Sequence, residues 1–134
     1  MHKHSILLAL GLSASLSLSA QADVLAQLQA GYAQQAQSAF SAADGEALWK
    51  HRFPDTKSGH ERSCTTCHTA NLSNTGKHAR TGKPIKPMAP SVNPQRLTNA
   101  ADVKKWLKRN CKWTLGRECT PQEKGDLLAF ISGQ

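Results

Sequence analysis

Apolar residues recur at helical spacing in several parts of the chain, whereas the alternation of apolar and polar residues that marks a strand is nearly absent. The first such stripe advances in steps of four residues: Val24, Leu28, Tyr32, Ala36 and Phe40. This spacing predicts one helix that continues to Phe40. Residues 23–134 contain only three Val and two Ile, which also argues against β-structure.

Two further helices are predicted in the middle of the chain. One is expected to begin at Asp44, a plausible N-cap, and to close at Phe53-Pro54. The other is centred on residues 103–110, where apolar positions and Asn110 share one face while the basic residues lie away from it. The inward face is expected to hold Val103, Trp106, Leu107 and Asn110.

The last helix has the clearest start signal. Thr120 can cap it, Pro121 suits its first turn, and Glu123 completes a Thr-x-x-Glu capping box. Its buried stripe is predicted to be Leu127, Leu128 and Ile131, with Phe130 at the margin.

A long segment between Pro54 and Leu97 is predicted to be loop. It carries Gly59, Gly76, Gly82, Pro84, Pro87, Pro90 and Pro94. Such a stretch is unusual inside a compact domain. It becomes compatible with one if a large buried cofactor fills the space beneath it. Together these patterns predict a single all-α domain.

The N-terminus has the features of an export signal. A basic head, Met1-His2-Lys3-His4, precedes an uncharged apolar run, and Ala20-Gln21-Ala22 offers a cleavage site. We therefore expect residues 1–22 to be a cleaved signal peptide and residues 23–134 to be the mature domain. The apolar run is short of the roughly 20 residues that span a bilayer, which disfavours the alternative of an uncleaved anchor. After cleavage we expect a periplasmic protein that is not integral to the membrane.

Charge and length narrow the class of partner. The chain has 134 residues and a formal net charge of +8, and its length excludes a multi-domain enzyme. Twelve of the basic residues lie between Arg62 and Arg117, where Asp102 is the only acid. Such a surface can steer an acidic partner, although a solvated basic surface without a partner fits equally well. Export argues against nucleic acid as the target.

The motif Cys64-Thr65-Thr66-Cys67-His68 predicts covalent attachment of a c-type haem. Two thiols at this spacing can each form a thioether with one haem vinyl group, and the adjacent imidazole of His68 can then reach the iron. A zinc site that adds Cys111 and Cys119 fits less well, because the gap between the two pairs is too long. A redox-active dithiol lacks its usual βαβ context.

The remaining pair, Cys111 and Cys119, is predicted to form a disulfide in an oxidising compartment. A ring this short contributes about 2–3 kcal/mol on the loop-entropy model. Two free buried thiols are the alternative.

The second axial ligand of the iron decides the function, because it sets both the potential and the access to the metal. On pattern alone, Met88 in Pro87-Met88-Ala89-Pro90 is favoured. Three histidines are further candidates: His51, His60 and His78. Asn110 is another, although an Asn at that place is also common near a helix C-terminus. For the haem propionates, Arg80 and Lys83 are the candidate partners.

From about Leu25 to the C-terminus the sequence resembles the sphaeroides haem protein family, small exported c-type cytochromes that bind oxygen. The matching stretches are Ser63-Cys64-Thr65-Thr66-Cys67-His68, Arg80-Thr81-Gly82-Lys83, Met88-Ala89-Pro90-Ser91, Lys105-Trp106-Leu107, Arg109-Asn110-Cys111 and Gly116-Arg117-Glu118-Cys119-Thr120-Pro121. The resemblance implies a fold like that of class I cytochromes c, with an extra N-terminal helix and a long loop around the haem. It also implies that Asn110 is the axial ligand, that Cys111 pairs with Cys119, and that multihaem c-type or membrane b-type cytochromes are redox partners.

An amide ligand would have a direct chemical consequence. A carboxamide oxygen is a hard, weak donor that suits ferric iron, whereas a methionine sulfur prefers the ferrous state. We therefore expect reduction to release Asn110 and to open the site to oxygen, nitric oxide or carbon monoxide. The alternative is an ordinary electron carrier with Met88 or a histidine permanently bound. An enzyme is a third possibility, but no acid-base constellation beyond scattered histidines supports it.

Overall fold

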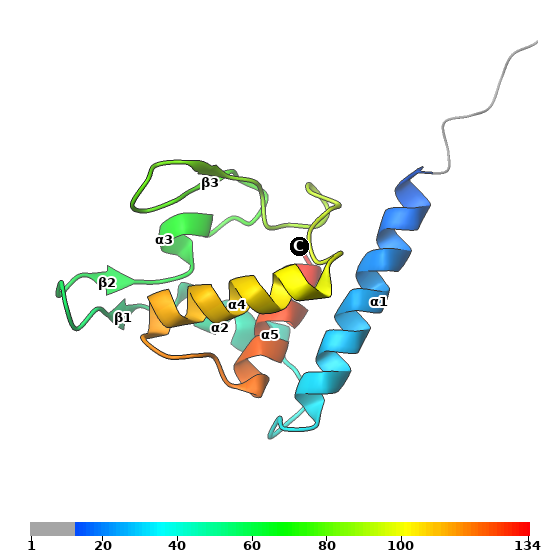
Figure 1. Ribbon diagram of the computed structural model, residues 1–134, viewed down its shortest axis with the longest axis horizontal. Coiled ribbons are helices and arrows are strands. Elements are labelled where there is room, and N and C mark those ends of the chain that lie inside the picture. Colours follow the sequence, from blue (N-terminus) through cyan, green and yellow to red (C-terminus); the bar gives the residue numbers. More distant parts are fainter. Residues whose placement is uncertain (1–12) are drawn as a thin grey trace, which may run out of the picture.

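The computed structural model describes the backbone of residues 13–134 and the side chains from residue 21 onward. In chain order the helices are α1 (Ser13–Ala33), α2 (Ala42–Lys50), α3 (Thr65–His68), α4 (Ala100–Leu115) and α5 (Pro121–Ser132) (Figure 1). The head of the expected signal peptide lies in residues 1–12, outside the described residues, and cleavage after Ala22 stays a prediction. Within the described part, no helix combines the length and the apolar character needed to cross a membrane.

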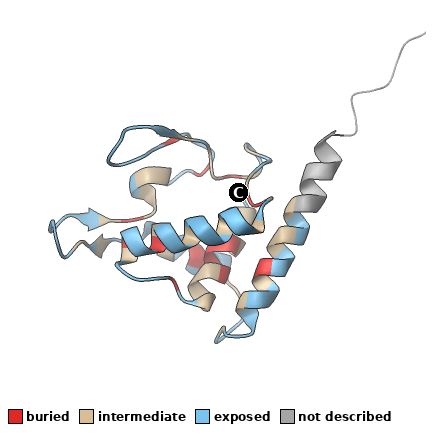
Figure 2. Cartoon of the chain, in the orientation of Figure 1, coloured by how far each residue is buried: buried red, intermediate tan, exposed pale blue. Residues whose placement is uncertain are grey.

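Helix α5 forms the centre of the core, and α1 and α2 both pack against it. Half of its residues are buried and none is exposed, whereas α4 is exposed along its outer side (Figure 2). Leu127, Leu128 and Ile131 are buried as predicted. Phe130 is also buried rather than marginal, because it packs against the ring of Trp49 at a centroid distance of 6.0 Å.

The start of α5 matches the sequence prediction. The hydroxyl of Thr120 accepts a hydrogen bond from the Glu123 N–H, and the Glu123 carboxylate accepts one from the Thr120 N–H. Pro121 occupies the first turn. This reciprocal capping satisfies two backbone donors that the helix itself leaves unpaired.

The prediction that the first helix continues to Phe40 is wrong, because α1 ends at Ala33. Residues 37–41 are held in a non-helical link by side chains of α5. The Gln122 amide oxygen accepts from the N–H groups of Gln37 and Ser38, at 3.1 and 3.0 Å. The Asp126 carboxylate accepts from the Ser41 N–H at 2.8 Å. These distant bonds override the local apolar spacing.

The boundaries of α2 also differ from the prediction. The N-cap is Ser41 rather than Asp44, since the Ser41 hydroxyl accepts from the Asp44 N–H at 3.1 Å. Asp44 lies in the first turn instead, where a negative charge is favourable. The helix ends at Lys50, and Phe53–Pro54 belongs to the strand that follows.

The segment predicted as loop contains two short antiparallel ladders. Strand β1 (Phe53–Pro54) pairs with β2 (Glu61–Arg62), and β3 (Gly76–Lys77) pairs with β4 (Pro84–Ile85). These strands are two residues long, so they anchor an otherwise irregular stretch without forming a sheet layer. The expectation of an all-α domain is confirmed, since helices make up most of the regular structure of the described residues.

Helix α4 is longer than residues 103–110. The Asn99 side chain caps its start by accepting from the Asp102 N–H at 3.0 Å, and Gly116 ends it with a φ of 74°. A left-handed residue at this place is most readily a glycine. Asn110 therefore lies inside the helix rather than at its C-terminus.

Helices α2 and α5 cross so closely that Gly45 contacts the backbone of Asp126, and a Cβ at Gly45 would overlap it. We expect Gly45→Ala to destabilise the holoprotein by about 1–3 kcal/mol, because the two backbones must move apart. Denaturant unfolding measures this. The matched control is Gly31→Ala in α1, where an added Cβ meets open space. This control should stabilise slightly, by about 0.5–1 kcal/mol. Equal stability of the two variants would contradict the close crossing.

Candidate functional site

A large cavity of about 620 Å³ lies among α2, α3, α4, α5 and the irregular segment before α4. Apolar side chains form much of its wall, among them Leu48, Ile85, Val103, Leu107 and Leu128. Cavities of this size are not left open in a small folded domain, where interiors pack as densely as organic crystals. The space therefore indicates a large, mostly apolar group.

Helix α3 brings the two thiols and the imidazole of the motif to one wall of this cavity. Cys64, Cys67 and His68 all line it. The Thr66 hydroxyl accepts from the Ser63 N–H at 3.0 Å and fixes the turn that leads into the helix. On the other side Gly76 packs so closely that a Cβ would overlap the Cys67 carbonyl oxygen, which holds β3 against the motif.

The His68 ring is set by α2. The buried Trp49 indole lies beside it at a centroid distance of 5.6 Å, and its Nε1 donates to the Thr69 carbonyl at 3.0 Å. Burial, and to a smaller extent the positive charge of Arg96, lowers the pKa of His68 to about 4. The imidazole is therefore neutral at physiological pH, which is the form that binds a metal.

Two features of the motif have no partner in the part of the chain that the structure describes. The Nδ1 atom of His68 is buried and has no hydrogen-bond partner among the described residues. Cys64 and Cys67 are not disulfide-bonded, and burial raises the pKa of the Cys64 thiol to about 12. A pair of free thiols beside a neutral imidazole suits covalent attachment of a haem better than it suits a structural site.

Two of the candidate sixth ligands lie at the cavity wall, one on α4 and one in the irregular segment before it. Asn110 lies on the inward face of the helix and lines the cavity, as does Met88 from the irregular segment. The Met88 N–H donates to the Leu72 carbonyl at 2.9 Å. His51, His60 and His78 are exposed and are not part of the cavity wall. The structure therefore narrows the candidates for the sixth position to Asn110 and Met88.

Arg80 and Lys83 lie in the turn between β3 and β4, exposed and outside the cavity wall. The structure does not bring them to the residues of the motif. Sequence reasoning missed two residues that contact the site, Trp49 and Arg96. Trp49 lies in a helix and Arg96 in an irregular segment, and neither belongs to a sequence motif that indicates contact with a cofactor.

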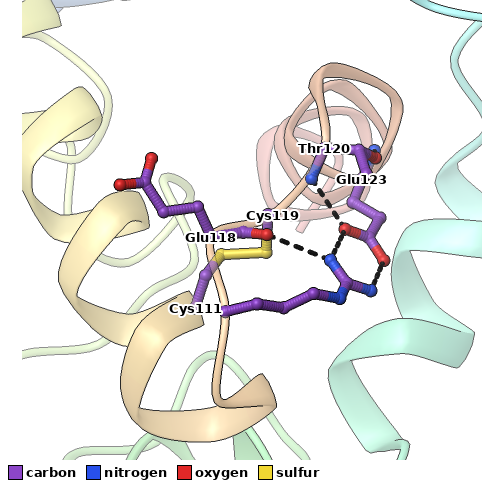
Figure 3. Close-up of polar contacts among 6 residues, drawn as sticks. Cys111, Glu118, Cys119, Thr120 and Glu123 are labelled. Atoms are coloured by element: carbon purple, nitrogen blue, oxygen red, sulfur yellow. Dashed lines mark hydrogen bonds and ion pairs between the residues drawn. A yellow bond between two sulfur atoms is a disulfide. The ribbon is translucent and has the colours of Figure 1, made fainter.

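Cys111 and Cys119 form a disulfide that links the end of α4 to the start of α5 (Figure 3). Both cysteines are buried. Next to it the Arg117 guanidinium donates to both Glu123 carboxylate oxygens at 2.7 Å, which lowers the pKa of Glu123. The disulfide uses two of the four thiols, so the alternative of a four-cysteine zinc site is wrong.

The outer surface of α4 is strongly basic. Its exposed cations are Lys104, Lys105, Lys108, Arg109 and Lys112. Trp106 is 48% exposed among them, with Lys105 Nζ 5.2 Å and Arg109 Cζ 5.3 Å from its ring centroid. Since Trp106 also lines the cavity, this surface lies directly over the candidate site.

The cavity volume, its apolar wall, the free thiol pair and the unpartnered imidazole all fit a covalently bound porphyrin, and together they define a c-type cytochrome. Residues 35–131 match a family described as a domain of unknown function, DUF1924. The chain is 48% identical over 112 residues to cytochrome c-type protein SHP from Cereibacter sphaeroides, covering 81% of this chain and 83% of that protein. It belongs to the sphaeroides haem protein family, and it carries a covalently attached c-type haem with iron.

Solved structures agree with this family. The structure of oxidised SHP, an oxygen-binding cytochrome c, matches with a TM-score of 0.72 and 47% identity, over 82% of this chain and 96% of that one. A solution structure of cytochrome c'' from Methylophilus methylotrophus, which concerns haem-ligand detachment, matches with a TM-score of 0.64 and 30% identity. It covers 91% of this chain and 96% of that chain.

Proposed function

We propose that this protein is an exported monohaem cytochrome in which Asn110 occupies the sixth iron position when oxidised and leaves it on reduction. Cys64 and Cys67 attach the haem by adding their S–H bonds across its two vinyl groups, and His68 is the permanent axial ligand. The haem supplies a reversible one-electron change and a coordination position that a small molecule can take. Oxygen and nitric oxide are the ligands that we expect there.

The observation that carries the proposal is that Asn110 and His68 line the same cavity from different elements, α4 and α3. The Asn110 amide oxygen is a hard, neutral donor, so its bond weakens when the iron gains an electron. Apolar neighbours on the same helix face, Val103 and Leu107, give an incoming diatomic an apolar environment.

The disulfide beside Asn110 restricts how the ligand can leave. Cys111 follows Asn110 directly and is tied to Cys119 near the start of α5. Since α5 is the buried centre of the fold, the backbone at the end of α4 is held in place. We infer that Asn110 leaves by rotation of its side chain, with little movement of the helix.

The descriptions of two similar proteins support the proposal that a ligand leaves the iron and oxygen binds. SHP is described as an oxygen-binding cytochrome c, and cytochrome c'' as a protein with haem-ligand detachment. We propose that electrons arrive from multihaem c-type or membrane b-type cytochromes in the periplasm. The basic surface of α4 would steer such donors if they are acidic, because its charges lie over the cavity.

A conventional electron carrier with Met88 bound in both oxidation states is the second candidate, because Met88 also lines the cavity. Near-infrared magnetic circular dichroism of the oxidised holoprotein separates the two, since it distinguishes a sulfur from an amide axial donor. We expect Met88→Leu to leave the spectrum unchanged and Asn110→Ala to abolish the amide signature. A sulfur signature that disappears in Met88→Leu would establish the second candidate instead.

A further inference from the structure

Arg96 presents a half-buried positive charge to the cavity without a carboxylate to balance it. Its Nε donates to the Pro87 carbonyl at 2.8 Å, and its Nη2 donates to the Lys86 carbonyl at 2.6 Å. Among the described arginines, Arg80, Arg96 and Arg109 form no ion pair, and of these three only Arg96 is half-buried. An uncompensated charge away from water is costly, so a position of this kind indicates an anionic partner that enters the cavity.

The wall around Arg96 is the polar part of the cavity. Gln95, Arg96, Thr98, Asn99 and Asp102 line it within one short stretch, while most of the other lining residues are apolar. A porphyrin has the same asymmetry, because both of its carboxylates stand on one edge of an apolar ring.

The residue after Arg96 has a strained backbone conformation, and the surrounding core holds this part of the chain in place. Leu97 has a φ of 60°, a left-handed conformation that is unfavourable for a non-glycine residue. Its side chain is buried in the core, which holds this conformation in place. Strain of this kind persists where the surrounding structure enforces it, often at ligand clamps. Arg96 is thus held ready before any partner binds.

We propose that Arg96 binds a propionate carboxylate of the haem, and that Arg80 and Lys83 do not. The inference rests on the proposed attachment at Cys64, Cys67 and His68. Two of the guanidinium donors are used on carbonyl groups, so others remain for a charge-assisted bond to a carboxylate. A positive charge in this place also stabilises the reduced iron, since reduction removes one positive charge from the centre.

The test compares oxidised holoproteins carrying Arg96→Gln, Arg80→Gln and Lys83→Gln. Resonance Raman spectroscopy of the propionate bending band reports the bond directly, and a redox titration reports the charge. We expect only Arg96→Gln to shift the band and to lower the midpoint potential. A wild-type band and potential in Arg96→Gln, or a shift in either control, would overturn the proposal.

Arg96→Lys is a second variant, for use if Arg96→Gln disrupts the conformation of the loop that contains residue 96. Lysine keeps the charge but cannot reproduce the planar pair of carbonyl bonds. We expect this variant to shift the propionate band while its potential stays closer to that of the wild type, and an unmoved band again contradicts the proposal. The axial ligand is read separately, from the dichroism of the same samples, so a failure of the Asn110 assignment would leave this result intact.

Discussion

We expect the double variant Cys64→Ser/Cys67→Ser to lose its covalent haem and, with it, its fold. Without the haem the cavity of about 620 Å³ would have to stay empty or collapse. At about 24 cal/mol per Å³, an empty cavity of that volume costs on the order of 15 kcal/mol, as much as the whole stability of a typical domain. Without the haem, the chain therefore cannot maintain the native fold around this cavity. Absorbance in the haem region and far-ultraviolet circular dichroism of the purified protein measure both losses.

The matched control removes the other two cysteines. Cys111→Ser/Cys119→Ser loses the disulfide but keeps the thiols of the motif, so we expect it to carry haem and to fold. Its stability should fall by about 2–3 kcal/mol, the contribution of a short disulfide ring. A helical, cooperatively unfolding Cys64→Ser/Cys67→Ser chain without haem would contradict the view that the cofactor completes the core.

The second prediction with a large expected effect concerns the affinity of the oxidised protein for azide. If Asn110 holds the sixth position in about 99% of oxidised molecules, azide binds only through the remaining 1%, and its apparent affinity is reduced by that fraction. Asn110→Ala removes the competitor. We therefore expect azide to bind the oxidised variant about a hundredfold more tightly than the wild type. Absorbance titration of the oxidised holoproteins measures this.

Asn74→Ala is the control for this comparison, because Asn74 is exposed and is not part of the cavity wall. It should bind azide like the wild type. Unchanged azide affinity in Asn110→Ala would mean that another group closes the site, and Met88 would be the remaining candidate.

Local signals in the sequence predicted local structure well. The capping box at Thr120 and Glu123 needs only residues three positions apart, and it forms as predicted. The end of α1 could not be predicted in this way, because it is set by Gln122 and Asp126, more than 80 residues further along the chain. The extra turns of α4 depend on its caps, Asn99 and Gly116, which the apolar pattern alone does not reveal.

The candidate site was predictable to a similar extent. Cys64, Cys67 and His68 are contiguous in the sequence, so the motif names them directly. Whether His51, His60 or His78 reaches the site depends on tertiary structure, and the fold leaves all three exposed. Arg96 was missed for the same reason, since its bonds to Lys86 and Pro87 arise only when the irregular segment folds back on itself.

The account depends most on what happens at the sixth position when the protein is reduced. The most direct measurement is the absorption spectrum of the reduced wild-type holoprotein, followed by rapid mixing with carbon monoxide over a range of concentrations. Release of Asn110 predicts a five-coordinate, high-spin reduced form and a binding rate that rises in proportion to the carbon monoxide concentration. A six-coordinate, low-spin reduced form, with a rate that levels off because an internal ligand must first dissociate, would contradict the account.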